Sequence, residues 1–143
     1  MRIIITALWA LALFVFTCSL NFHLLIQHQI LNFRFNSSPD WSELLNLDFQ
    51  WYSRDWISRK IGHFFGFFTL ALLASNFGKI KSAFYWCVFY AAFTEILQLF
   101  FFRGGRIYDV INDALGILLA YFLCTIQLRK SARITQRFKN NTR

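Results

Sequence analysis

Four long apolar segments most strongly limit how this chain can fold, because a helix needs about 20 largely apolar residues to cross a bilayer. Such segments cover residues 3–21, 61–77, 82–102 and 110–128, with residues 57–60 serving as the first turn of the second. They do not show the period-two alternation of transmembrane β-strands. The sequence therefore predicts an all-α integral membrane protein with four transmembrane helices.

The composition argues against a soluble domain. Hydrophobic residues make up 57% of the 143 residues and charged residues only 15%, against roughly 25% charged residues in an ordinary globular domain. A soluble chain of this length could not bury so much apolar surface. The net charge of +8 comes from basic residues between and after the apolar segments, where membrane topology explains them better than nucleic-acid binding does.

The three cysteines, Cys18, Cys87 and Cys124, each lie in a different apolar segment. An odd number of separate cysteines in apolar surroundings is typical neither of a disulfide framework nor of a metal site. We expect them to be small packing residues, and we expect no metal ion, no other cofactor and no nucleic-acid partner.

The distribution of Lys and Arg predicts the orientation, since cytoplasmic loops carry the excess of these residues. With the N-terminus inside, nine of the 15 basic residues are cytoplasmic: one before the first segment, two between the second and third, and six after the fourth. No small-x-small cleavage site follows the first segment, so we expect it to remain as an anchor. We predict both termini in the cytoplasm, one transmembrane domain over residues 1–128, and a basic cytoplasmic tail over residues 129–143.

The loop between the first two segments is expected to lie outside and to carry structure of its own. Asp40, followed by Glu43 three residues on, is typical of a helix N-cap. Tryptophans such as Trp41 and Trp51 suit the boundary between membrane and water, where a ring can be buried while its polar edge stays wet. The sequence predicts one or two short amphipathic helices in this loop.

Polar residues at helical spacing occur in the outer half of three of the four segments. Residues three or four apart share one face of a helix. An ionised carboxyl group near the middle of a bilayer costs roughly 2.5–3.5 kcal/mol, so Glu95 should face other helices rather than lipid. Its expected partners are Lys60, His63 or an arginine. The spaced residues are Lys60 and His63 on the second segment, Glu95 and Gln98 on the third, and Asp109, Asn112 and Asp113 on the fourth.

Residues 103–106, Arg-Gly-Gly-Arg, predict a tight reversal between the third and fourth segments, because paired glycines can take the backbone angles of a short turn. These two helices should then be antiparallel neighbours, with Arg103 and Arg106 at the membrane boundary. Small residues also allow helices to approach closely. They are Gly62 and Gly66 on the second segment and Gly116 and Ala120 on the fourth.

The polar residues, in this order and spacing, resemble the VanZ-like family. Its pattern is K-x-x-H-F-x-x-F, then E-x-x-Q-x-F, then an arginine and D-x-x-x-N-x-x-G. This chain has KIGHFFGF at 60–67, EILQLF at 95–100, Arg106, and DVINDALG at 109–116, so that the resemblance covers about residues 55–125. Asp113 stands where the family has asparagine, and Asn112 precedes it. The resemblance implies a small bacterial inner-membrane protein, in a family whose founding member is associated with teicoplanin resistance.

Three functions fit these predictions. The first is a non-enzymatic envelope protein with an outward-facing polar pocket, in which basic side chains hold an anionic group and the others fix its geometry by hydrogen bonds. Its ligand would be an anionic envelope lipid, a lipid-linked cell-wall precursor or a lipophilic glycopeptide. The predicted binding residues are Lys60, His63, Glu95, Gln98, Arg103, Arg106, Asp109, Asn112 and Asp113.

The second function is a membrane-embedded enzyme that acts on a lipid-linked substrate, with His63 and Glu95 as the catalytic acid–base candidates. The sequence has no recognised nucleophile motif or phosphate-binding loop beside them. The third is a small transporter subunit, which would need a homo-oligomer because four helices leave little room for a path. The polar residues could instead form an internal clamp that only fixes helix packing.

Overall fold

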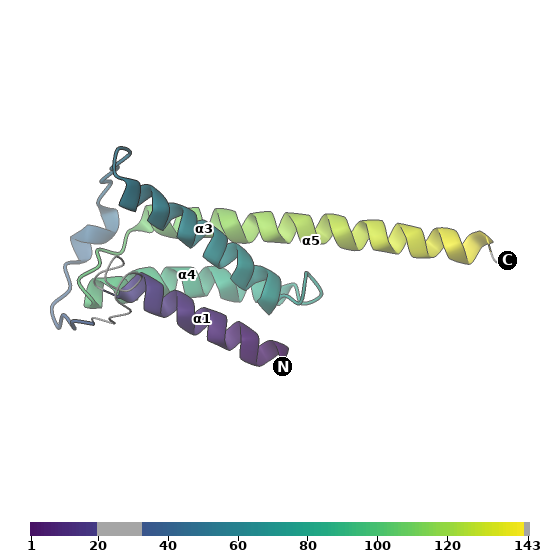
Figure 1. Ribbon diagram of the computed structural model, residues 1–143, viewed down its shortest axis with the longest axis horizontal. Helices are drawn as coiled ribbons and strands as arrows, with labels where there is room; N and C mark the ends of the chain where they lie inside the picture. Colours follow the sequence, from purple (N-terminus) through teal and green to yellow (C-terminus); the bar gives the residue numbers. More distant parts are fainter. Residues whose placement is uncertain (20–32, 142–143) are drawn as a thin grey trace.

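The computed structural model describes residues 1–19 and 33–141, and all regular structure in these ranges is helical (Figure 1). Four α-helices and one short 3-10 helix occur there. They are α1 (Arg2–Cys18), η1 (Trp41–Leu45), α3 (Arg54–Ala74), α4 (Ser82–Phe100) and α5 (Ile107–Asn141). The all-helical class predicted from the sequence is therefore confirmed for the described residues.

Each predicted segment corresponds to one α-helix, but the helices differ in how well they suit a bilayer. Within the described residues, α4 and residues Ile107–Arg137 of α5 are long and apolar enough to cross a membrane. Helix α1 is apolar but has 17 residues, and residues 20–21 of its predicted span lie outside the described residues. Helix α3 has 21 residues, and four charged side chains occupy its first two turns. Two of the four helices thus qualify as candidate spans by length and composition.

The last helix continues beyond the predicted span. Helix α5 has 35 residues, which corresponds to a length of about 52 Å at the usual helical rise. The predicted fourth span ends at residue 128, but the helix continues through the basic residues to Asn141. Figure 1 shows this last part extending past the other helices. The N-terminus, the turn between α3 and α4, and the C-terminus all lie toward that same end of the bundle.

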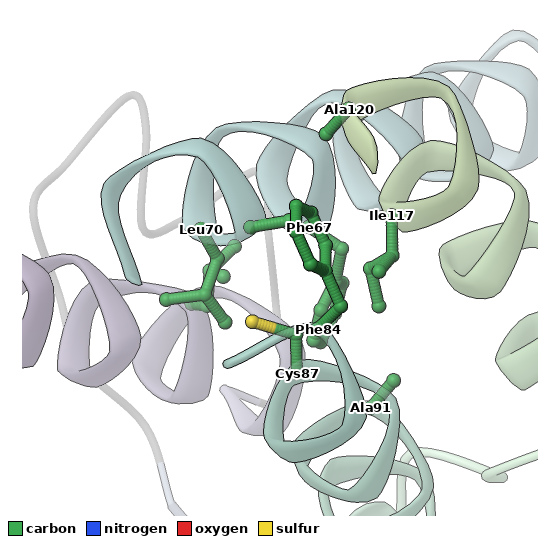
Figure 2. Close-up of a cluster of buried hydrophobic side chains, with 9 residues drawn as sticks. Phe67, Leu70, Phe84, Cys87, Ala91, Ile117 and Ala120 are labelled. Atoms are coloured by element: carbon green, nitrogen blue, oxygen red, sulfur yellow. The ribbon is translucent and has the colours of Figure 1, made fainter. Parts of the chain in front are cut away.

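The core lies where α3, α4 and α5 meet, with α1 covering one side (Figure 2). It is small and built around Phe67 on α3, which is fully buried. Cys87 and Cys124 are buried and not disulfide-bonded, as the sequence analysis predicted for packing residues. The other buried members of the core are Leu13, Leu70, Ala71, Phe84, Ala91, Ile117 and Ala120.

Large apolar side chains cover the outside of the helices. Trp86 and Tyr85 on α4 and Phe122 on α5 are well exposed, and so are Ile3 and Leu8 on α1. Such a continuous apolar surface would drive aggregation in water, whereas it suits contact with lipid tails. The small interior and the apolar exterior follow from the same composition.

Close helix packing depends on two glycines. A Cβ atom at Gly116 would lie 2.3 Å from the carbonyl oxygen of Phe64, so α5 approaches the backbone of α3 directly. A Cβ atom at Gly66 would lie 2.6 Å from a methyl group of Leu13 on α1. A Cβ atom at Gly62 would meet nothing within 4 Å. The predicted small-residue contacts are therefore correct for Gly66 and Gly116 and wrong for Gly62, which faces an open space between α1 and α3.

The reversal between α4 and α5 uses both of its glycines. Gly104 has φ +61°, in the left-handed region that glycine tolerates best. Gly105 is buried, and a Cβ atom there would lie 1.8 Å from the carbonyl oxygen of Glu95. The predicted tight turn is therefore present, and it places the start of α5 directly against the backbone of α4.

In the described part of the loop before α3, residues 33–53, the regular structure is one short 3-10 helix, while residues 22–32 of the predicted loop lie outside the described residues. Asp40 caps η1, and its Oδ1 atom accepts hydrogen bonds from the backbone and the hydroxyl group of Ser42 at 2.9 and 2.7 Å. These hydrogen bonds lower the pKa of the Asp40 carboxyl group. The predicted N-cap is therefore confirmed, but it begins a single 3-10 turn of five residues. The Trp41 ring packs edge-on against Phe100 with centroids 6.0 Å apart, which holds this turn on the end of α4.

Candidate functional site

The predicted site residues gather at the end of the bundle where α3 and α5 begin and α4 ends (Figure 1). Lys60 on α3 forms an ion pair with Asp109 on α5. Its ammonium group also lies 4.3 Å from the centre of the Tyr108 ring and 5.0 Å from that of Trp56, at distances where a ring attracts a cation. The same helices are joined by Asn112, whose Nδ2 atom donates to the carbonyl oxygen of Lys60 at 2.9 Å.

One turn further along, three ionisable groups from three helices meet. The Nδ1 atom of His63 on α3 lies 3.3 Å from Oδ2 of Asp113 on α5 and 3.7 Å from Oε1 of Glu95 on α4. Both carboxylates are buried, and the His63 side chain is 16% exposed. On each helix, the spacing of three or four residues from another polar residue predicted that the group faces inward. The contacts between the helices then bring the three groups together.

Glu95 is held by donors on both oxygens. The Gln98 side chain donates to Oε1 at 2.7 Å, and the backbone N–H of Arg106 donates to Oε2 at 2.9 Å. The predicted partners of Glu95 are therefore right for His63, and right for Arg106 through its backbone only. Gly105 permits this second contact, because a side chain there would push the loop away from α4.

The Arg106 side chain points to the loop instead of the carboxylate of Glu95. It donates to the carbonyl oxygen of Asp48 at 3.1 Å and to the Tyr108 hydroxyl group at 2.7 Å, and it lies 3.4 Å from the Asp48 carboxylate. Its ion-pair partner is thus a loop residue that the sequence analysis did not single out. Tyr108 donates to the same carbonyl oxygen at 3.2 Å. No spacing rule relates Asp48 to α5, so only the folded chain reveals this anchor.

Two adjoining cavities open beside these groups. The first is polar and small, about 40 Å³, and the second is apolar, about 440 Å³, between α1 and α3. Three residues line both: Arg59, His63 and Arg103. The polar cavity is also lined by Trp56, Lys60, Gln98, Gly104, Arg106 and Asp109, and the apolar cavity by Trp9, Leu13, Phe16, Thr17, Ser58, Gly62, Phe65, Gly66 and Thr69.

The two arginines at the junction lie within electrostatic reach of each other. Partial burial lowers the pKa of Arg103, and the neighbouring positive charge of Arg59 lowers it further; a guanidinium group nevertheless stays charged at neutral pH. The Nε atom of Arg103 donates to the carbonyl oxygen of Thr17 at 3.2 Å, which ties the turn before α5 to α1. Arg103 is among the binding residues predicted from the sequence, whereas Arg59 is not, although Arg59 directly precedes Lys60.

Two features of the chain are those of a helical membrane protein. The outside of its helices is apolar, and a buried ionic cluster links three of them. The chain belongs to the VanZ/LLP1 family, whose profile matches residues 3–128. It is 36% identical over 140 residues to the "Uncharacterized membrane protein YwnJ" of Bacillus subtilis (strain 168), an alignment that covers 96% of this chain and all of that protein. No solved structure matches the chain significantly. The resemblance stated from the polar motifs is therefore confirmed.

Proposed function

We propose that this protein binds an anionic lipid of the bacterial envelope, with the headgroup in the polar cavity and an acyl chain in the apolar cavity. The observation that carries the proposal is the junction of the two cavities at Arg59, His63 and Arg103. A lipid presents an anionic group directly joined to an apolar chain, and the paired cavities offer the same two environments in the same order. The apolar cavity has a volume within the range of small-molecule sites, roughly 300–1,000 Å³.

The position of the basic side chains relative to the two cavities indicates which of them would hold the headgroup. Lys60 forms an ion pair with Asp109, and Arg106 forms one with Asp48. A ligand would have to compete with these carboxylates, so we do not assign the headgroup to Lys60 or Arg106. Arg59 and Arg103 lie at the junction, and their mutual repulsion is relieved when an anion lies between them. A guanidinium group binds a phosphate oxygen pair through two parallel hydrogen bonds. These two arginines are our proposed headgroup ligands.

The proposal predicts that Arg59→Gln weakens binding of phosphatidylglycerol by about 10- to 100-fold, since a charge-assisted hydrogen bond contributes about 1.5–3 kcal/mol. The measurement is titration of the purified protein with a fluorescent phosphatidylglycerol in detergent micelles. Arg54→Gln is the matched control, because Arg54 is exposed on the same helix and lines neither cavity. Equal affinity for phosphatidylcholine, or equal loss in both variants, would contradict the proposal.

A companion variant tests the acyl-chain cavity. Gly62→Leu directs a side chain into the open space beside Gly62, so it should weaken binding of the diacyl lipid while leaving binding of soluble glycerol phosphate unchanged. A fall in both affinities would show that the variant disturbs the headgroup residues instead. Binding of glycerol phosphate as tightly as the lipid would identify the ligand as a free phosphate compound. Lipid-linked cell-wall precursors and teicoplanin are the further ligands to be compared in the same titration.

We infer that the protein crosses the inner membrane four times, with both termini and the basic residues 129–143 in the cytoplasm. The excess of Lys and Arg on that side supports this topology, as does the position of both termini at one end of the bundle (Figure 1). In a background in which alanine replaces the three cysteines, Tyr52→Cys should react with an impermeant thiol reagent in intact cells. Asn140→Cys should react only after lysis. Reaction of Asn140→Cys in intact cells would reverse the topology.

A membrane-embedded enzyme remains the second candidate, and one observation favours it. His63 lies beside both Glu95 and Asp113 and lines both cavities, so its ring could move a proton to or from a bound lipid. The activities of the Glu95→Ala and Glu95→Gln variants separate this function from lipid binding alone.

A further inference from the structure

We propose that His63, Glu95 and Asp113 bind a divalent transition-metal ion. Each residue offers one ligand atom, and these three atoms lie within 4.8 Å of one another. The inference goes beyond the proposed function, because it concerns an inorganic ligand whose binding does not require the lipid.

The spacing of the ligand atoms suits an ion between them. Zinc ligands lie about 2.0–2.2 Å from the metal, so two ligands of a tetrahedral ion are about 3.4 Å apart. The Nδ1 atom of His63 lies 3.3 Å from one carboxylate oxygen of Asp113 and 3.7 Å from one of Glu95. Three helices supply the ligands, and small rotations of the side chains would centre an ion among them.

The surrounding hydrogen bonds already orient one ligand as metal sites require. Glu95 receives a hydrogen bond from the Gln98 side chain and another from the Arg106 backbone. Ligating carboxylates are typically held by such outer partners, which set their direction and tune the metal. Gly105 permits the second of these hydrogen bonds, because a Cβ atom there would lie 1.8 Å from the carbonyl oxygen of Glu95.

Asp113 provides the second, independent observation. Its side chain is fully buried, and the Oδ1 atom has no hydrogen-bond partner among the residues that the structure describes. A buried carboxylate oxygen without a donor is costly, and a metal ion would satisfy it. A divalent ion would also neutralise both Glu95 and Asp113, whereas a protonated His63 neutralises only one of them.

The mixed ligand set indicates which ions to expect. An imidazole nitrogen favours Zn²⁺ and similar ions, while carboxylate oxygens also accept Mn²⁺; Mg²⁺ prefers oxygen ligands and water. Three protein ligands leave a coordination position open, as in catalytic zinc sites. Because His63 lines the polar cavity, that position would face the space where we place the headgroup, and an anionic oxygen could occupy it.

The test is a calorimetric titration of the chelator-treated protein in detergent with Zn²⁺, Mn²⁺ and Mg²⁺ separately, with no anionic lipid added. We expect about one Zn²⁺ per chain and clearly weaker Mg²⁺ binding. Asp113→Asn and His63→Gln should each reduce Zn²⁺ affinity at least about tenfold, as loss of even an outer-shell partner does. Asp55→Asn is the matched control, since Asp55 is exposed at the start of α3, and its affinity should equal that of the unaltered protein.

Two further measurements keep the result decisive. Circular dichroism and gel filtration identify any variant that has lost its fold, and the visible absorption of bound Co²⁺ reports the ligand geometry in the unaltered protein. Failure of the unaltered protein to bind Zn²⁺ or Mn²⁺, or unchanged affinity in folded Asp113→Asn and His63→Gln variants, overturns the proposal. Since no lipid is present, such a failure leaves the lipid-binding proposal to its own test.

Discussion

Replacing Gly116 by alanine should destabilise the helix bundle by about 3 kcal/mol, at the upper end of the usual cost of overpacking. The added Cβ atom would lie 2.3 Å from the carbonyl oxygen of Phe64 and 3.3 Å from the backbone nitrogen of Phe68. Backbone atoms of a helix cannot rotate aside as a flexible side chain can, so α3 and α5 must separate. That movement would also break the Lys60–Asp109 ion pair between the same two helices.

The measurement is unfolding of the purified protein by titration with sodium dodecyl sulfate, followed by circular dichroism. Gly62→Ala is the matched control, because Gly62 lies in α3, where the same methyl group meets nothing within 4 Å. This control should be stabilised by about 0.5–1 kcal/mol, since alanine is the better helix former. Equal stability of the two variants would show that α3 and α5 do not pack as closely as described.

Glu95→Ala should cost about 3–5 kcal/mol of stability, the range for removing one partner from a buried ionic contact. The change leaves His63 without one of its two carboxylates and deprives the Gln98 side chain and the Arg106 backbone of their acceptor. It also creates a cavity at a fully buried position. Glu95→Gln keeps the volume and one acceptor oxygen, so it should lose much less stability.

The same pair of variants distinguishes the two candidate functions. If the protein only binds lipid, folded Glu95→Gln should retain a sizeable share of phosphatidylglycerol affinity and of complementation in a deletion strain. If it catalyses proton transfer, Glu95→Gln should abolish complementation while lipid affinity persists. The stability prediction itself fails if Glu95→Ala unfolds at the same detergent concentration as the unaltered protein.

The helices and the faces on which their polar residues lie could be predicted from sequence for definite reasons. Apolar segments of bilayer length can satisfy their backbone groups only as helices, and a spacing of three or four residues puts side chains on one face. Hence Lys60 and His63, Glu95 and Gln98, and Asp109 and Asp113 do share inward faces. The paired glycines also marked correctly the turn that makes α4 and α5 neighbours.

The helix ends were harder to predict than the helices themselves. The predicted fourth span stopped where the residues become basic, yet α5 continues to Asn141, because hydropathy marks the end of an apolar stretch and not the end of a helix. Arg, Lys and Gln are good helix formers, so the helix can extend into polar surroundings. In the described part of the predicted loop, residues 33–53, the cap at Asp40 begins a 3-10 helix of five residues, because a cap starts a helix and does not determine its length.

Sequence by itself determined the all-helical class, the family and the set of polar residues that turn inward, because each depends on local spacing and composition. Only the tertiary structure decided how these residues pair: Lys60 with Asp109, His63 with Asp113, and Arg106 with Asp48. Helical periodicity specifies a face, but an ion pair or a metal ligand requires distances correct to a few tenths of an ångström. Those distances depend on how closely the turn at Gly105 approaches α4 and how closely α5 approaches α3 at Gly116, and both approaches are properties of the packed bundle.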